Sequence, residues 1–107
     1  MATRALIHMP RAARRGDVVE VRALIAHAME TGFRADSEGR MLPRNILRRF
    51  ECRQGGELVF GADLHPAIAA NPYLSFFVAV GDGGEFVFTW TGDEGFQHRE
   101  TVNLLVG

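Results

Sequence analysis

Apolar and polar residues alternate along much of the chain, which is the pattern of half-buried β-strands. In the segment 18–27 every second residue from Val19 to Ile25 is apolar, while charged residues occupy the other face. In the segment 85–91 every second residue from Phe86 onward is aromatic. Seven runs of this kind are predicted as strands: 4–9, 18–27, 46–53, 58–64, 74–80, 85–91 and 97–106.

Glycine, proline, aspartate and asparagine separate these runs and predict frequent turns. Gly55-Gly56 and the segment 81–84 are each interpreted as hairpin turns. Residues 12–15 are too few for more than a turn, and residues 65–70 offer at most one helical turn before Asn71-Pro72. Seven short strands in 107 residues predict an all-β sandwich that forms one domain over 1–107.

Two segments stand out from this pattern. Residues 28–45 form a long irregular stretch in which Met29 and Phe33 stand out among polar residues, and loops of that length are often functional. The segment 73–80 is apolar on both faces, with Tyr73, Phe77 and Ala79 on the face opposite Phe76. A strand in a two-layer sandwich has one core face, so its other face needs a second cover. That cover is either the long loop or another chain.

Composition and charge exclude several classes of function. The chain has 12 arginine and lysine residues against 13 acidic ones, a net charge of −1, and every basic residue is arginine. This balance argues against a nucleic-acid partner, and the lack of lysine removes Schiff-base chemistry. No apolar run is long enough to span a membrane, and the first residues show no signal peptide.

The sequence contains no recognisable catalytic or metal-binding motif. Cys52 is the sole cysteine and alternates with Phe50 in a predicted strand, which is typical of a buried, inert thiol. The four histidines are scattered, and neither an HxH nor an HExxH motif occurs. No glycine loop leads into a helix to hold a phosphate. We therefore expect no catalytic residue, metal or cofactor, and a protein that is not an enzyme.

Arginines gather in two places along the chain. Arg11, Arg14 and Arg15 precede the second strand, and four more arginines line the third, at positions 44, 48, 49 and 53. Such runs are ordinarily solvated, and neighbouring glutamates offset part of the charge. The other interpretation is a docking face for an anionic ligand or an acidic partner, since arginine binds carboxylates through a bidentate fork.

Several segments resemble SoxZ proteins of the multienzyme system that oxidises thiosulfate. Residues 4–10 (RALIHMP) and 15–22 (RGDVVEVR) are similar to the start of that family, and residues 25–32 are similar apart from Ala28, where a proline is expected. The segments 62–73 (ADLHPAIAANPY) and 88–93 (FTWTGD) carry the most specific similarity. The resemblance covers nearly the whole chain.

The resemblance implies an immunoglobulin-like sandwich and a non-catalytic role beside SoxY, which bears the sulfur-carrying cysteine on a flexible glycine-rich arm. Residues 103–107 of this chain hold no cysteine, so we do not expect it to be the arm-bearing subunit. The expected contact with SoxY uses surplus apolar residues: Met29, Phe33, Tyr73, Phe76 and Phe77. Arg11, Arg14 and Arg15 are weaker candidates for docking another Sox enzyme.

The resemblance also sets expectations about location and assembly. The Sox system works in the periplasm, so the chain is expected to be exported together with SoxY. Contacts with other Sox enzymes are expected to be transient, and the isolated chain could pair with itself through its apolar face. The rival function is a β-sandwich module that binds a small ligand.

Overall fold

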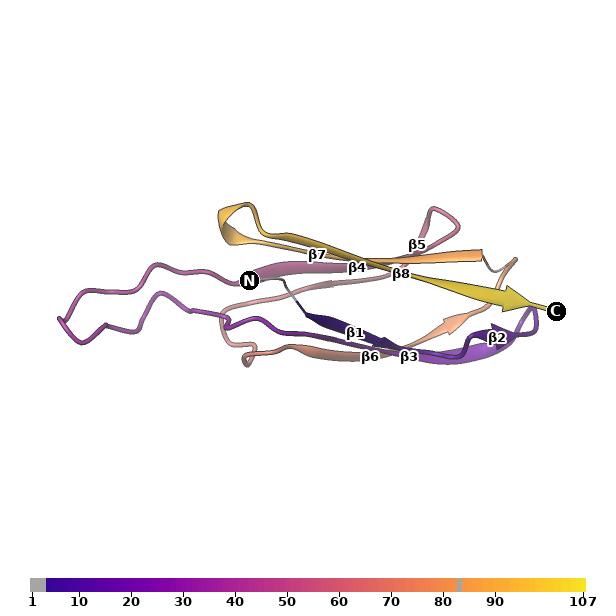
Figure 1. The fold of residues 1–107 in the computed structure, drawn as a ribbon, viewed down its shortest axis with the longest axis horizontal. Coiled ribbons are helices and arrows are strands. Elements are labelled where there is room, and N and C mark those ends of the chain that lie inside the picture. Colours follow the sequence, from indigo (N-terminus) through magenta and orange to yellow (C-terminus); the bar gives the residue numbers. More distant parts are fainter. Residues whose placement is uncertain (1–3, 83) are drawn as a thin grey trace.

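The computed structural model describes residues 4–82 and 84–107 and shows two β-sheets packed face to face (Figure 1). The three-stranded sheet has the order β1-β3-β6 and consists of β1 (Ala5–His8), β3 (Val18–Ile25) and β6 (Tyr73–Ala79). The five-stranded sheet has the order β2-β8-β7-β4-β5 and consists of β2 (Ala12–Ala13), β8 (Gln97–Val106), β7 (Gly84–Gly92), β4 (Leu47–Gln54) and β5 (Glu57–Asp63). This arrangement confirms the predicted all-β, immunoglobulin-like sandwich.

Each of the seven predicted runs corresponds to a strand, with ends that differ by at most two residues, and the described residues add an eighth strand. The interpretation of residues 12–15 as a turn was wrong, because Ala12 and Ala13 pair in parallel with Leu105 and Val106 of β8. Two residues are too few to show a periodicity, so only the fold reveals this strand. Residues 65–68 make a single turn, closed by the Ile68 N–H donating to the His65 carbonyl at 2.9 Å.

The two predicted hairpin turns have different outcomes. Gly55 and Gly56, with φ of 58° and 87°, join the paired strands β4 and β5 as expected of a two-residue hairpin. The interpretation of 81–84 as a hairpin was wrong, because β6 and β7 belong to different sheets. Glycine marks a reversal of the chain, but it does not specify whether the flanking strands pair.

Aromatic side chains fill the space between the sheets. Phe50, Phe86, Phe88 and Trp90 are all fully buried, and the rings of Phe50 and Trp90 lie 5.1 Å apart. Phe60 of β5 stacks on Phe76 of β6 with a ring separation of 4.1 Å, which joins the two sheets along one side. The described residues include one short 3-10 helix, η1 (Asp93–Gly95), and no helix among them is long and apolar enough to cross a membrane.

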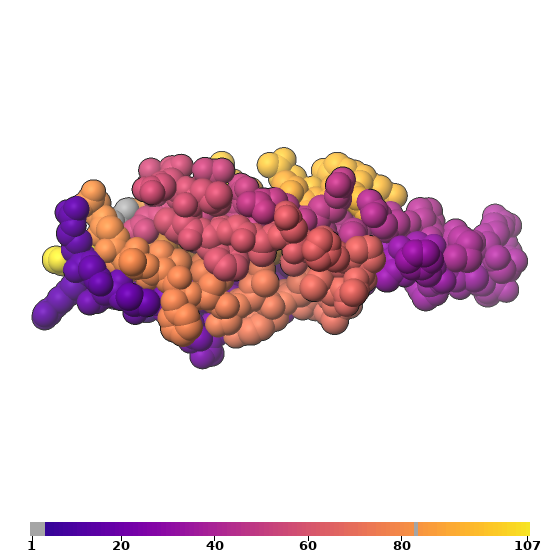
Figure 2. All heavy atoms as spheres, turned by 180° about the vertical axis from the view of Figure 1, so that it is seen from behind, coloured from indigo at the N-terminus to yellow at the C-terminus, as the bar shows by residue number. Residues whose placement is uncertain are grey.

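Residues 28–45, which we call the arm, link β3 to β4 and extend beyond one end of the sandwich (Figures 1 and 2). The molecule is elongated, with extents of 59 × 24 × 19 Å. Two antiparallel bridges, Glu30–Asn45 and Ala35–Met41, turn the predicted irregular segment into a hairpin. The connection therefore projects as a separate element and does not cover the outer face of either sheet (Figure 1).

Candidate partner-binding surface

The outer face of the three-stranded sheet, which points away from the five-stranded sheet, carries two apolar rows. The register places Leu6 beside Leu24 and Leu24 beside Tyr73, so these three residues form a row at the end of the sheet nearest the arm. Phe77 lies two rows further along and pairs with Glu20, and the row after it consists of Val18 and Ala79. Tyr73 is 56% exposed and Phe77 is 68% exposed.

A polar band separates the two apolar rows. Arg22 and Glu20 form an ion pair at 2.9 Å, and the Ser75 hydroxyl donates to the Glu20 carboxylate at 3.0 Å. These contacts, the Ser75 hydrogen bond first, lower the pKa of Glu20 below its ordinary value. The outer face therefore combines apolar side chains with a charged pair that stays ionised at neutral pH, as protein interfaces commonly do.

The predicted surplus of apolar residues on strand β6 is real, and no described part of the chain covers it. Tyr73 and Phe77 point outward, whereas Phe76 and Val78 point into the core. Of the two covers considered from the sequence, the long loop does not supply one, since it projects away as the arm (Figure 1). A second chain is left as the candidate cover.

Two of the five residues expected at the interface need correction. Met29 and Phe76 are both about 5% exposed and belong to the core, so this surface does not include them. Phe76 was assigned to the surface although its alternation places it inside, and Met29 was judged by its polar neighbours. The Met29 sulfur accepts a hydrogen bond from the Leu47 N–H at 3.2 Å, which holds the base of the arm against β4.

The structure also brings in residues that the sequence reasoning missed. Leu6, Val18 and Leu24 share the outer face with Tyr73 and Phe77, and Leu6 and Val18 are largely exposed. A signal was present for two of them, because Val18 and Leu24 alternate out of phase with the buried set in β3. Phe33 lies on the arm, away from this sheet, and is 83% exposed.

Arg11, Arg14 and Arg15 flank the short strand β2, which lies at the end of the sandwich opposite the arm (Figure 1), and all three are exposed. Arg15 pairs with Asp82 at 2.5 Å, and the Arg14 backbone N–H donates to the Asp17 carboxylate at 2.9 Å. Exposed pairs of this kind contribute little to stability, so these side chains can rearrange to meet another surface.

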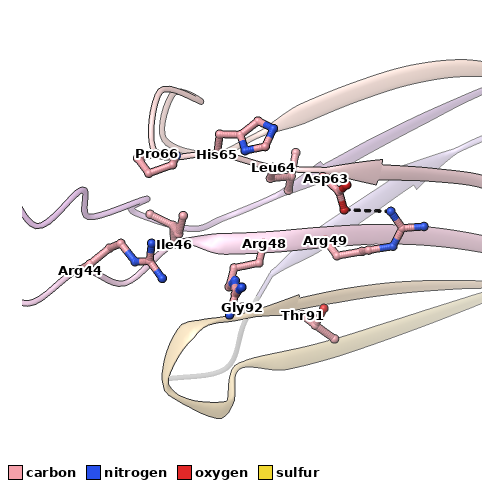
Figure 3. A pocket seen from close by; sticks show the side chains of 10 residues that line it. All are labelled: Arg44, Ile46, Arg48, Arg49, Asp63, Leu64, His65, Pro66, Thr91 and Gly92. Carbon is pink, nitrogen blue, oxygen red and sulfur yellow. Dashed lines mark hydrogen bonds and ion pairs between the residues drawn. The ribbon is translucent and has the colours of Figure 1, made fainter.

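Three members of the second arginine group, Arg44, Arg48 and Arg49, line a pocket of about 600 Å³ where β4 leaves the arm (Figure 3). The fourth, Arg53, lies outside this pocket and pairs with Glu51 at 3.2 Å. Arg44 binds Asp93 through two contacts of 2.8 and 3.0 Å, and Arg49 binds both Asp63 and Glu51. Arg48 is the third guanidinium, and it forms no ion pair with a described residue. Because two of the three charges are already neutralised, the pocket offers a single free guanidinium rather than a cradle for an anion.

Cys52 lies in the core of β4 and has no exposed surface. Burial raises the pKa of its thiol to about 12, so the reactive thiolate is absent at neutral pH. The histidines lie apart on different elements, and among residues 4–82 and 84–107 no three side chains of a metal-ligating type come together.

Comparisons with known proteins place the chain in a family and identify its fold. A family model described as "Sulphur oxidation protein SoxZ" matches residues 7–103. A search of curated proteins found no match. A superoxide reductase (neelaredoxin) from Ignicoccus hospitalis has a similar structure, with a TM-score of 0.71 and 13% identity over 96% of this chain and 79% of that one.

A second similar structure is the sulfur carrier protein SoxY from Chlorobium limicola f thiosulfatophilum. Its TM-score is 0.67 with 15% identity, covering 96% of this chain and 78% of that chain. At such identities the two structures establish the shared sandwich fold, while the family model covers most of the sequence. The chain therefore belongs to the SoxZ family of sulphur oxidation proteins, the subunits that pair with SoxY in the SoxYZ sulfur carrier.

Proposed function

We propose that this chain supports SoxY without taking part in the chemistry, and that it binds SoxY through the outer face of its three-stranded sheet. The observation that carries this proposal is the uncovered apolar surface around Tyr73 and Phe77. Large exposed aromatic side chains on a regular sheet are typical of surfaces that bind another protein.

The buried thiol supports the non-catalytic part of the proposal. A sulfur carrier needs a cysteine that can form a thiolate and reach its enzymes, and Cys52 meets neither condition. Covalently bound sulfur would therefore stay on SoxY. The contribution of this chain would be to present a rigid surface beside the flexible cysteine-bearing segment of SoxY.

The test is the binding of SoxY to single-residue variants, measured by native mass spectrometry and calorimetry. Phe77→Asp replaces the exposed aromatic ring on β6 with a charge, and we expect it to weaken the one-to-one complex by about 100-fold or more, as loss of an aromatic hot-spot residue does. The domain should stay folded, because the Phe77 side chain points into solvent.

Leu105→Asp is the matched control. Leu105 is 74% exposed on β8 of the other sheet, so the same change in chemistry occurs away from the outer face. We expect this variant to bind SoxY like the unchanged chain. If the Phe77 and Leu105 variants bind SoxY with equal affinity, the outer face is not the interface. If the unchanged chain does not bind SoxY, the proposed function is wrong.

We also propose that the pair works in the periplasm and that SoxY carries the export signal for both chains. Fractionation of cells that produce this chain with and without SoxY tests the idea. We expect the chain in the periplasm only when SoxY is present with its signal peptide. A chain that reaches the periplasm alone, or stays in the cytoplasm beside exported SoxY, would contradict it.

A further inference from the structure

The arm is a preformed hairpin rather than a loose loop. At its base the Glu30 N–H donates to the Asn45 carbonyl at 2.9 Å, and the Asn45 N–H donates back at 2.7 Å. Near its tip the Asp36 carboxylate accepts the N–H groups of Glu38 and Arg40 at 2.9 and 3.0 Å. These bonds close the turn from within the arm.

The junction with the sandwich fixes the direction of the arm. The bidentate contact between Arg44 and Asp93 joins the second strand of the arm to η1. Gly32 has a φ of 89°, and a Cβ at this position would approach the Cβ of Arg44 to 3.1 Å. Together with the buried side chain of Met29, these contacts hold both strands of the arm at its base.

The arm has one apolar face, and nothing within the chain covers it. Ala35 bridges Met41, so these two side chains lie on the same side of the hairpin, and Phe33 and Pro43, two residues further towards the base, have the same phase of the alternation. All four are exposed, Phe33 by 83% and Met41 by 58%. The other side carries Arg34, which pairs with Glu30 at 2.6 Å.

An exposed apolar face on a two-stranded hairpin is an unusual feature in a protein that works alone. An isolated two-stranded hairpin is at best marginally stable, and an uncovered apolar face promotes aggregation. A partner that stays bound removes both problems, whereas a transient partner leaves the face open for most of the time. The arm therefore suits a permanent partner.

The size of the outer face also indicates that the arm and the sheet bind the same permanent partner. The three strands hold four, eight and seven residues. With about 3.4 Å per residue and strands about 4.8 Å apart, they give a flat footprint of about 310 Å². Stable complexes bury about 800 Å² on each partner, so the sheet leaves much of that area to other surfaces. The row of Leu6, Leu24 and Tyr73 lies at the end of the sheet from which the arm departs, so the arm lengthens this surface.

We propose that the arm is a clasp: its apolar face, formed by Phe33, Ala35, Met41 and Pro43, packs against an apolar patch on the SoxY subunit. This inference rests on the proposed function, since it assigns a second contact to the same partner. The clasp lengthens the lifetime of the complex, and the outer face supplies the first contact.

Calorimetry and dissociation kinetics with SoxY test the clasp. The double variant Phe33→Asp and Met41→Asp puts two charges on the apolar face, and we expect an affinity at least about tenfold lower, expressed mainly as faster dissociation. Ser37→Asp is the matched control, because it adds a charge at the exposed tip beyond the apolar face. It should bind SoxY like the unchanged chain.

The outcomes separate this inference from the proposed function. If Phe77→Asp abolishes binding and the double arm variant binds normally, the clasp is wrong and the outer face stands. If the unchanged chain does not bind SoxY, both are wrong. Sedimentation of the isolated chain tests whether a second copy of this chain binds the apolar face of the arm instead of SoxY. If the chain forms a dimer that only the arm substitutions dissociate, while SoxY binding stays normal, the arm pairs with a second copy and the clasp is wrong.

Discussion

Two neighbouring residues of β6 show how a single position decides whether a side chain builds the core or a binding surface. Phe76 faces inward, stacks on Phe60 and is about 5% exposed, whereas Phe77 faces outward and is 68% exposed. Successive side chains of a strand alternate between its faces, so the sequence already contained this distinction. Grouping both residues at the interface ignored the alternation.

Cys52 allows the most direct test at the level of one residue. Its thiol is fully buried and has a pKa of about 12, so it should react with a disulfide reagent only when the chain opens. At pH 8 we expect no labelling of the native chain over hours, and one thiol per chain after addition of guanidinium. Rapid labelling of the native chain would show that the thiol is accessible.

Substitution of the same residue tests whether it takes part in sulfur transfer. Cys52→Ala removes one buried atom and should lower the free energy of unfolding by about 1–2 kcal/mol, because it leaves a small cavity. Thiosulfate oxidation by the reconstituted Sox system should be unchanged at a temperature where the variant is folded. If the variant forms a folded complex but thiosulfate oxidation is lost, Cys52 takes part in sulfur transfer.

At the level of elements, the sequence predicted the strands well and their connections poorly. Strands β3 and β7 were predictable because alternation over eight or nine residues is a strong signal of a strand with one buried face. β2 was not predictable, since its two residues form a strand only because β8 lies beside them. The same holds for the link from β6 to β7, whose glycines do not show that the chain changes sheets.

For the arm, the sequence predicted a long functional segment but not its hairpin structure. Its length suggested a functional loop, and Phe33 stood out among polar neighbours. The hairpin itself depends on the cross-strand bridge between Ala35 and Met41 and on the turn held by Asp36, and neither shows as an extended alternating run. The grouping of Phe33 with Met41 and Pro43 became visible only from that pairing.

At the scale of the whole molecule, the contacts at the arm end link stability to pH. His27 Nδ1 accepts the Met29 N–H at 3.0 Å, which requires an unprotonated nitrogen at that position. Partial burial lowers the pKa of His27, and the negative charge of Asp93 opposes this effect. Hydrogen bonds from Arg34 and Arg49 lower the pKa values of Glu30 and Glu51, respectively.

All these shifts act in the same direction on acidification, but in two separate ranges of pH. Below the ordinary histidine value of about 6.5, the unfolded chain binds a proton at His27 before the folded chain does, so the free energy of unfolding falls. The carboxylates add stability that is complete above their ordinary values of about 4 and is lost as the pH falls through their lower folded values. The first range therefore reports on His27, and the second reports on the ion pairs.

Urea unfolding between pH 8 and pH 5 separates His27 from the other titrating groups when the chain is compared with its His27→Asn variant. The asparagine carbonyl can accept the Met29 N–H in place of Nδ1, yet it does not titrate. We expect the unfolding midpoint of the unchanged chain to fall as the pH drops from 7 to 5, and the variant to lose clearly less over the same range. Parallel curves for the two proteins would show that His27 keeps its ordinary protonation, and that the base of the arm does not depend on its neutral form.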